Sequence, residues 1–186
     1  MSYYDVEAIL TEAEKVPCTF NFDSNELGYL DNNPSEPLKA GTQLNLPIWL
    51  AQMLAASTTV NGESAVTMAL PEALSHELVQ ALKADPRAVA VRERAANFYN
   101  LAERMLDLFD DVPLAAVVRY SWIMRAAEIA VLARRTGEEG NAAVGNSGPL
   151  GEEFLRGLDE WERKLFRVAH EARKDTKEWM EKGARA

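Results

Sequence analysis

Residues 114–135 read LAAVVRYSWIMRAAEIAVLARR, and this stretch decides how the rest of the chain must fold. Between Pro113 and Ala133 it carries only three charged residues, namely Arg119, Arg125 and Glu128. A helix that is apolar nearly all round needs cover on most of its sides. A chain of 186 residues has few other helices to supply that cover. We therefore expect part of this helix to meet another protein.

Two further helices are predicted before this stretch. Leucines at 74, 78 and 82 recur every fourth residue, and Pro86 ends that pattern because it restricts the residue before it. A second apolar stripe, with spacings of three and four residues, predicts one helix over 91–109. Its members are Val91, Ala95, Phe98, Ala102, Met105 and Phe109.

The C-terminal part is predicted to be a flexible connection followed by a long helix. Residues 136–151 hold five of the ten glycines, which favours a flexible segment. Apolar residues beyond it alternate at spacings of four and three, which is typical of a heptad seam. The seam comprises Phe154, Leu158, Trp161, Leu165, Val168, Ala172 and Trp179.

The first seventy residues mix short helices with short strands. Ser2 and the acids near it predict a short capped helix that ends before Pro17. Strands are expected at 16–22, 27–31, 43–46 and 66–70, the first two as a hairpin, with a helix at 48–56 after Pro47. The predicted fold class is α+β, mainly α, with a small strand-rich domain at 1–70 and a helical-bundle domain at 71–186.

Composition excludes several classes of protein. With 20 Lys and Arg against 29 Asp and Glu, the net charge is −9, which argues against a chain that grips nucleic acid by itself. A lone cysteine, Cys18, fits a reducing compartment and the role of a small buried hydrophobe. The apolar run at 46–56 is too short to cross a bilayer, so we expect no membrane partner.

Catalytic and metal-binding patterns are missing from the sequence. His76 and His170 each precede a Glu, but Gln80 and Lys174 stand where a zinc-protease helix needs its second His. Gly140 to Gly145 has the spacing of a phosphate loop without its closing Gly-Lys-Ser/Thr. We expect no catalytic residue, no metal and no cofactor.

Tryptophans on predicted helices are candidates for contacts with other proteins. Aromatic anchors of this kind occur in cores and at interface hot spots alike. Trp122 lies in the over-apolar helix and Trp161 in the heptad seam. These two are the side chains that we expect at an interface.

The order of segments resembles a known family, the GINS complex of eukaryotic DNA replication, and within it the third of the subunits named as partners of Sld-five. The most specific run is GTQLNLPIWLA at 41–51. DVEAIL at 5–10, LGYL at 27–30, NFY at 97–99 and LDEWERKLF at 158–166 extend the resemblance over nearly the whole chain. The sequence resembles those of filamentous fungi.

This resemblance implies a non-catalytic subunit of a nuclear complex of four chains. Its partners would be the three other GINS subunits, the minichromosome-maintenance ring and a RecJ-like helicase partner, with DNA touched only indirectly. By position, the contacts in the tetramer would involve Phe98, Tyr99, Leu158, Trp161, Leu165 and Phe166, in addition to Trp122. The small domain would join the helical one through Leu46, Pro47, Trp49 and Leu50.

Two other functions are compatible with the residues alone. A self-associating adaptor would use the seam from Phe154 to Trp179 to form a homodimer. A small ligand-binding protein would need a closed pocket between helices, lined by Tyr99, Tyr120 and Trp122.

Overall fold

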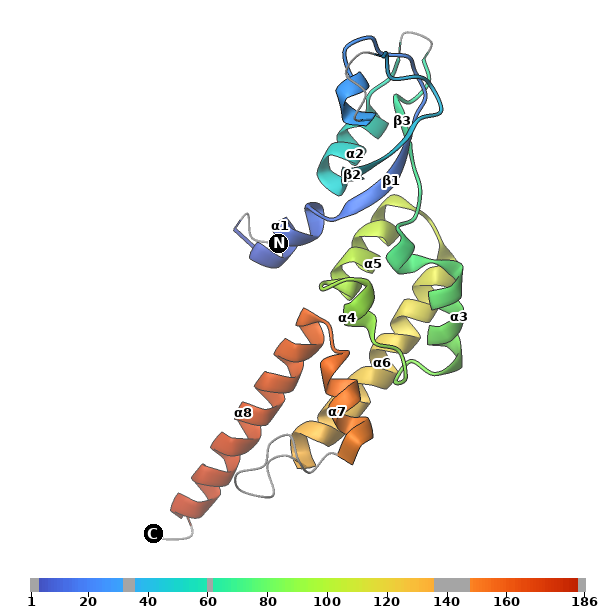
Figure 1. Cartoon of the computed structure of the whole chain (residues 1–186). Coiled ribbons are helices and arrows are strands. Elements are labelled where there is room, and N and C mark those ends of the chain that lie inside the picture. Colours follow the sequence, from blue (N-terminus) through green and yellow to red (C-terminus); the bar gives the residue numbers. More distant parts are fainter. Residues whose placement is uncertain (1–3, 32–35, 60–61, 136–147, 184–186) are drawn as a thin grey trace. The chain divides into compact units, whose positions relative to one another are not determined.

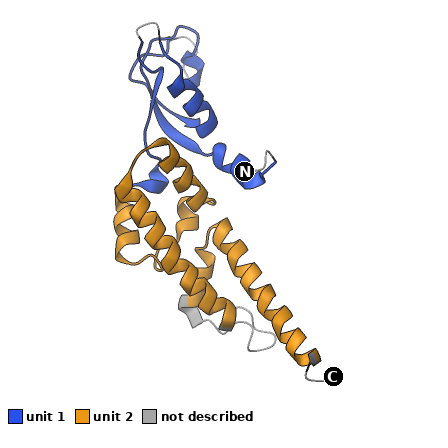
Figure 2. Ribbon diagram, turned by 180° about the vertical axis from the view of Figure 1, so that it is seen from behind, with its two compact units in different colours: residues 1–75 blue, residues 76–186 orange. Residues whose placement is uncertain are grey.

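Two compact units make up the chain in the computed structural model, which describes residues 4–31, 36–59, 62–135 and 148–183. The units are residues 1–75 and residues 76–186 (Figure 2). The first contains a small sheet with short helices, and the described part of the second contains helices alone (Figure 1).

The first unit is built on a three-stranded antiparallel sheet. Strand β1 (Lys15–Phe20) lies in the middle, between β2 (Gln43–Pro47) and β3 (Val66–Met68). Val16 is paired with Leu46, and Cys18 with both Leu44 and Met68. Helix α1 (Val6–Glu12) precedes the sheet, and helix α2 (Ile48–Ala56) follows β2 directly.

One face of this sheet forms the core of the unit. Burial alternates along β1, as the two-residue period of a strand requires, and α2 contacts all three strands. The nearly inaccessible side chains are Val16, Cys18, Phe20, Leu38, Ile48, Ala51 and Val66. Cys18 is thus the small buried hydrophobe that its sequence context predicts, and burial raises the pKa of its thiol.

The predicted hairpin between 16–22 and 27–31 is wrong. Residues Gly28–Asp31 form a 3-10 helix, η1, and both neighbours of β1 come from elsewhere in the chain. Tyr29 and Leu30 are adjacent and both exposed, so this segment lacks the alternation that would bury one face of a strand. Ser24 instead exchanges backbone hydrogen bonds with Leu38.

The second unit is arranged around one long helix, α6 (Val112–Arg135), which contacts α3, α5 and α8 (Figure 1). The other helices are α3 (His76–Ala84), α4 (Val91–Arg94), α5 (Phe98–Leu108), α7 (Gly148–Arg156) and α8 (Glu160–Gly183). Leu74 precedes α3, in a 3-10 turn η2 at Glu72–Leu74, rather than opening that helix.

Two predicted long helices are each interrupted. The stretch 91–109 is α4 and α5, separated at 95–97, and the stretch 154–179 is α7 and α8, separated at 157–159. The heptad seam is therefore not continuous. Residues 148–151 of the predicted flexible connection belong to α7, while 136–147 lie outside the described residues. The fold class, α+β and mainly α, is confirmed.

Candidate protein interaction surface

The two helix interruptions lie against each other. Arg92 donates its backbone N–H to the Gly157 carbonyl oxygen at 3.2 Å, and Glu160 donates to the Ala96 carbonyl oxygen at 3.1 Å. Each break thus offers a carbonyl oxygen to the first turn of a helix in the other pair, where the backbone N–H groups have no partner within their own helix. This pairing joins the α4–α5 pair to the α7–α8 pair.

Gly157 permits the close approach of the two segments. A Cβ atom at this position would lie 2.9 Å from the Ala90 Cα atom, which is closer than real Cβ atoms approach backbone. Any larger residue would push the two segments apart. The glycine directly after α7 therefore sets how closely the α7–α8 break approaches the residue before α4.

Asp159 and Glu162 start helix α8 as a capping box. Glu162 donates its backbone N–H to Asp159 Oδ1 at 2.8 Å, and Asp159 donates its own to Glu162 Oε2 at 3.0 Å. Asp159 Oδ2 also accepts the backbone N–H of Tyr99 at 3.1 Å, in the first turn of α5. One carboxylate therefore holds the beginnings of two helices.

Arg125 occupies the centre of this arrangement. Its side chain and that of Glu162 are both fully buried, and they form a bidentate ion pair with distances of 2.6 and 2.9 Å. The guanidinium also lies over the Phe154 ring, 4.9 Å from its centroid. Its remaining N–H groups donate to the carbonyl oxygens of Pro86, Val89 and Gly157. We call Arg125, Glu162 and Asp159 the buried charge cluster.

Burial raises the pKa of two groups in and beside this cluster. Loss of hydration raises the pKa of Asp159 to about 6, against the lowering effect of its two backbone hydrogen bonds. Burial also raises the pKa of the Tyr99 hydroxyl, and the Glu162 carboxylate acts in the same direction. Tyr99 remains a neutral partner of the Ser121 hydroxyl, with the two oxygens 2.9 Å apart.

Within the described part of the second unit, one side of helix α6 is exposed. The buried side chains along it are Leu114, Val117, Ser121, Arg125, Ile129 and Leu132. The outer stripe, on roughly the opposite side, consists of Ala116, Tyr120, Ile123, Ala127 and Val131, all of them exposed. The exposed fractions of Tyr120, Ile123 and Val131 are 47%, 55% and 42%.

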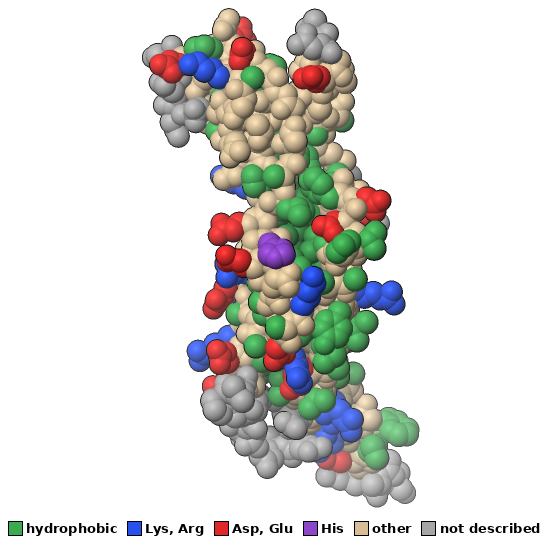
Figure 3. All heavy atoms as spheres, turned by 90° about the vertical axis from the view of Figure 1, so that its right-hand side faces the viewer, with side chains coloured by type: hydrophobic (Ala, Val, Ile, Leu, Met, Phe, Trp, Pro, Cys, Tyr) green, Lys and Arg blue, Asp and Glu red, His purple; other side chains and the backbone are tan. Residues whose placement is uncertain are grey.

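This outer stripe is about 22 Å long at the helical rise of 1.5 Å per residue. No acidic side chain interrupts it among the described residues of α6. Hydrophobic side chains also form a nearly continuous band on the face of the helical unit drawn in Figure 3. Contiguous apolar surface of this kind marks a place where another protein binds.

A shallow groove lies beside the outer stripe, between α5, α6 and the first turn of α8. Its volume is about 390 Å³. Tyr99 and Trp122 meet edge to face in its wall, with ring centroids 4.9 Å apart, and Trp161 also lines it. The interface candidates Tyr99, Trp122 and Trp161 are thus brought together.

The other interface candidates lie deeper or elsewhere. Phe98 and Leu158 are buried in the core of this chain, so their side chains are not available to a partner. Leu165 and Phe166 are partly buried against the core cluster that contains Leu158. Their contribution to a tetramer stays a prediction.

The four predicted inter-domain residues belong to the first unit. Leu46 and Pro47 end β2, and Leu46 is buried against β1. Trp49 and Leu50 begin α2, where 52% of Trp49 is exposed. Their role in joining the two units stays a prediction.

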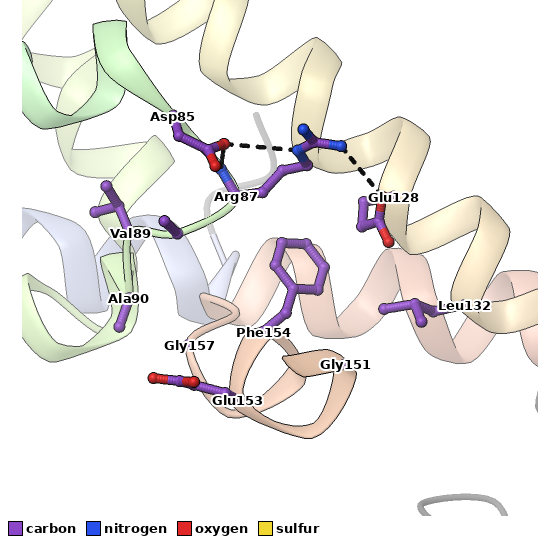
Figure 4. A pocket seen from close by; sticks show the side chains of 11 residues that line it. Asp85, Arg87, Val89, Ala90, Glu128, Leu132, Gly151, Glu153, Phe154 and Gly157 are labelled. Atoms are coloured by element: carbon purple, nitrogen blue, oxygen red, sulfur yellow. Dashed lines mark hydrogen bonds and ion pairs between the residues drawn. The ribbon is translucent and has the colours of Figure 1, made fainter. Parts of the chain in front are cut away.

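The arrangement disfavours a ligand-binding function built on Tyr99, Tyr120 and Trp122. Tyr99 and Trp122 line an open groove, and Tyr120 is not part of its lining. A larger pocket of about 520 Å³ lies near Phe154, where Arg87 reaches towards both Asp85 and Glu128 (Figure 4).

The described residues contain no group of three His, Cys, Asp or Glu side chains placed to hold a metal ion. Among the described residues, no helix is both long enough and apolar enough to cross a membrane.

The buried charge cluster was not anticipated from the sequence, although two signals for it exist. Asp159 and Glu162 have the spacing of a capping box, three residues apart. Arg125 is one of few charges in a nearly apolar helix, and a charge in such a place is buried only when it is paired. The partner of Arg125 could not be chosen from spacing alone.

Replacing Arg125 tests the cluster. Arg125→Met leaves the buried Glu162 carboxylate without a positive partner, and we expect the free energy of unfolding to fall by about 3–5 kcal/mol. The free energy of unfolding should fall less for the double variant Arg125→Met/Glu162→Gln, because neither buried charge remains. Arg119→Met, at an exposed site on the same helix, is the control. Urea unfolding of the full chain measures all three, and equal losses for Arg125→Met and Arg119→Met would contradict the cluster.

The raised pKa of Asp159 predicts a pH dependence of stability. Because the folded-state value of about 6 exceeds the unfolded value near 3.9, the folded chain holds this proton more tightly. The contribution of Asp159 to stability therefore falls as the pH rises from about 4 to about 6. As the pH rises from 4 to 7, the free energy of unfolding of Asp159→Asn should increase by about 2–3 kcal/mol relative to that of the unsubstituted chain. Urea unfolding at several pH values checks this, with exposed Asp110→Asn as control; parallel curves would refute it.

Comparisons with known proteins agree with this architecture. Residues 4–56 match the family model described as PSF3 N-terminal domain, and residues 73–181 match the GINS complex protein helical bundle domain. The chain is 47% identical to the DNA replication complex GINS protein psf3 of Neurospora crassa, over 97% of this chain and 98% of that one. The proteins of the same description from Gibberella zeae and Saccharomyces cerevisiae are 52% and 35% identical, over 98% and 97% of this chain and 98% of each relative. The chain therefore belongs to the PSF3 family of GINS complex proteins.

Proposed function

We propose that this chain is a non-catalytic subunit of a four-chain GINS complex that acts as a scaffold in chromosomal DNA replication. The observation that carries the proposal is the outer stripe of α6, an apolar surface that nothing within the described helical unit covers. A surface of this kind is typical of subunits that fold and function inside an assembly. Family membership identifies the assembly as GINS.

The mechanism is binding rather than chemistry. The GINS tetramer joins the minichromosome-maintenance ring and a RecJ-like partner in the replicative helicase, where the ring hydrolyses ATP. Contacts made by the GINS subunits hold the ring in a form that can unwind DNA. In this chain the buried charges serve the fold, since Arg125 and Glu162 are satisfied by one another and by backbone groups.

The net charge of this chain is consistent with a complex in which the ring, and not this subunit, binds the DNA. The net charge of −9 disfavours direct binding to phosphate, so the DNA is held mainly by the ring and only indirectly by this chain. The place of action is the nucleus, where chromosomal replication occurs.

Assembly with the other subunits tests the proposal. Co-expression with the three other GINS subunits of the same organism should give one peak in size-exclusion chromatography with light scattering, containing one copy of each chain. Ile123→Asp should weaken this complex by at least about tenfold, because a charge would be buried in the apolar interface. Tyr29→Asp changes an equally exposed residue of the other unit and serves as control.

Two outcomes would contradict the proposal. A folded chain that elutes alone, or paired with itself, in the presence of the other three subunits would favour the self-associating adaptor instead. A complex that forms equally well with Ile123→Asp would show that the outer stripe is not the interface.

A further inference from the structure

The groove beside the outer stripe has an apolar floor between two helices. Leu106 of α5 and Ala115 and Val118 of α6 line it, together with the rings of Tyr99, Trp122 and Trp161. It is wide and shallow, unlike the enclosed sites that bury small ligands. Such a shape fits the apolar side of a helix from another protein.

Two tryptophans lie in this groove with part of their surface accessible. Trp122 is held by its edge-to-face contact with Tyr99, whose hydroxyl is in turn hydrogen-bonded to Ser121. Trp161 is 43% exposed, and the Lys164 ammonium lies 5.5 Å from its ring centroid. Rigid aromatic side chains in a preformed depression are typical of the anchors at the centre of an interface.

The rim of the groove carries charges that no other described residue neutralises. Glu103 and Asp107 lie one helical turn apart on α5, and both are exposed. Arg119 lies on the α6 side. None of these three side chains makes an ion pair within the described residues. Two acids at this spacing match two basic side chains three or four residues apart on a facing helix.

We propose that this groove receives an amphipathic helix of a neighbouring GINS subunit, with two Lys or Arg side chains one turn apart that pair with Glu103 and Asp107. The apolar side of that helix packs on Trp122 and Trp161. The net charge of −9 attracts a cationic segment, in agreement with this occupant. The inference deepens the proposed function and rests on the assembly proposed there.

Site-specific crosslinking within the assembled complex identifies the occupant. The full chain, with p-benzoylphenylalanine in place of Asn100 in the groove lining, is co-expressed with the three other subunits and irradiated. Mass spectrometry should place the crosslink in a helix of another subunit that carries the basic pair. Glu103→Lys/Asp107→Lys should lower the yield by about tenfold or more, because like charges then face each other. Changing the basic pair of the partner to Glu should restore it.

A matched variant separates this contact from a general effect of charge. Glu178→Lys/Glu181→Lys makes the same change in net charge one turn apart near the end of α8, and the crosslink yield should stay unchanged. A crosslink to a segment without a basic pair, to a protein outside the complex, or with a yield that charge reversal does not alter would overturn the inference while the four-chain complex still forms. Absence of that complex with the unsubstituted chain would instead overturn the assembly itself, and this inference with it.

Discussion

The guanidinium of Arg125 is the interaction on which the helical unit depends. It is fully buried, and its hydrogen bonds reach Glu162 of α8, the segment before α4 and the break between α7 and α8. A buried charge is tolerated only when it is paired and its donors are satisfied, so these segments must keep their places around it. Helix α6 is thereby fixed on its inner side, and its outer stripe remains free to meet other proteins.

Much of the fold could be predicted from local patterns. The strand pattern at 43–46 and the proline after it locate β2 and the start of α2, and the apolar stretch from Leu114 locates α6. The two helix breaks could not be predicted, because the apolar spacing continues across both of them. Each break leaves no signal of its own in the local pattern, because its carbonyl oxygen accepts the backbone N–H of a residue more than sixty positions away. The Gly157 oxygen accepts from Arg92, and the Ala96 oxygen from Glu160.

The candidate site could be predicted in part. Trp122 and Trp161 stand out by residue type, and both line the groove. Phe98 and Leu158 have the same apolar character but lie in the core, since spacing cannot distinguish a side that faces the chain itself from one that faces a partner. The buried charge cluster depends on which acid meets Arg125, and that is decided only by the packing of α6 against α8.

The central claim is that Arg125 and its partners hold α6 so that its outer stripe and the adjoining groove are covered on assembly. Hydroxyl-radical footprinting of the chain alone and in the four-chain complex measures this directly, because Tyr, Trp and Met side chains react according to their exposure. The account predicts that oxidation of Tyr120, Trp122 and Trp161 falls on assembly, while that of exposed Tyr29 is unchanged. Equal oxidation of Tyr120 and the two tryptophans in both states would contradict it.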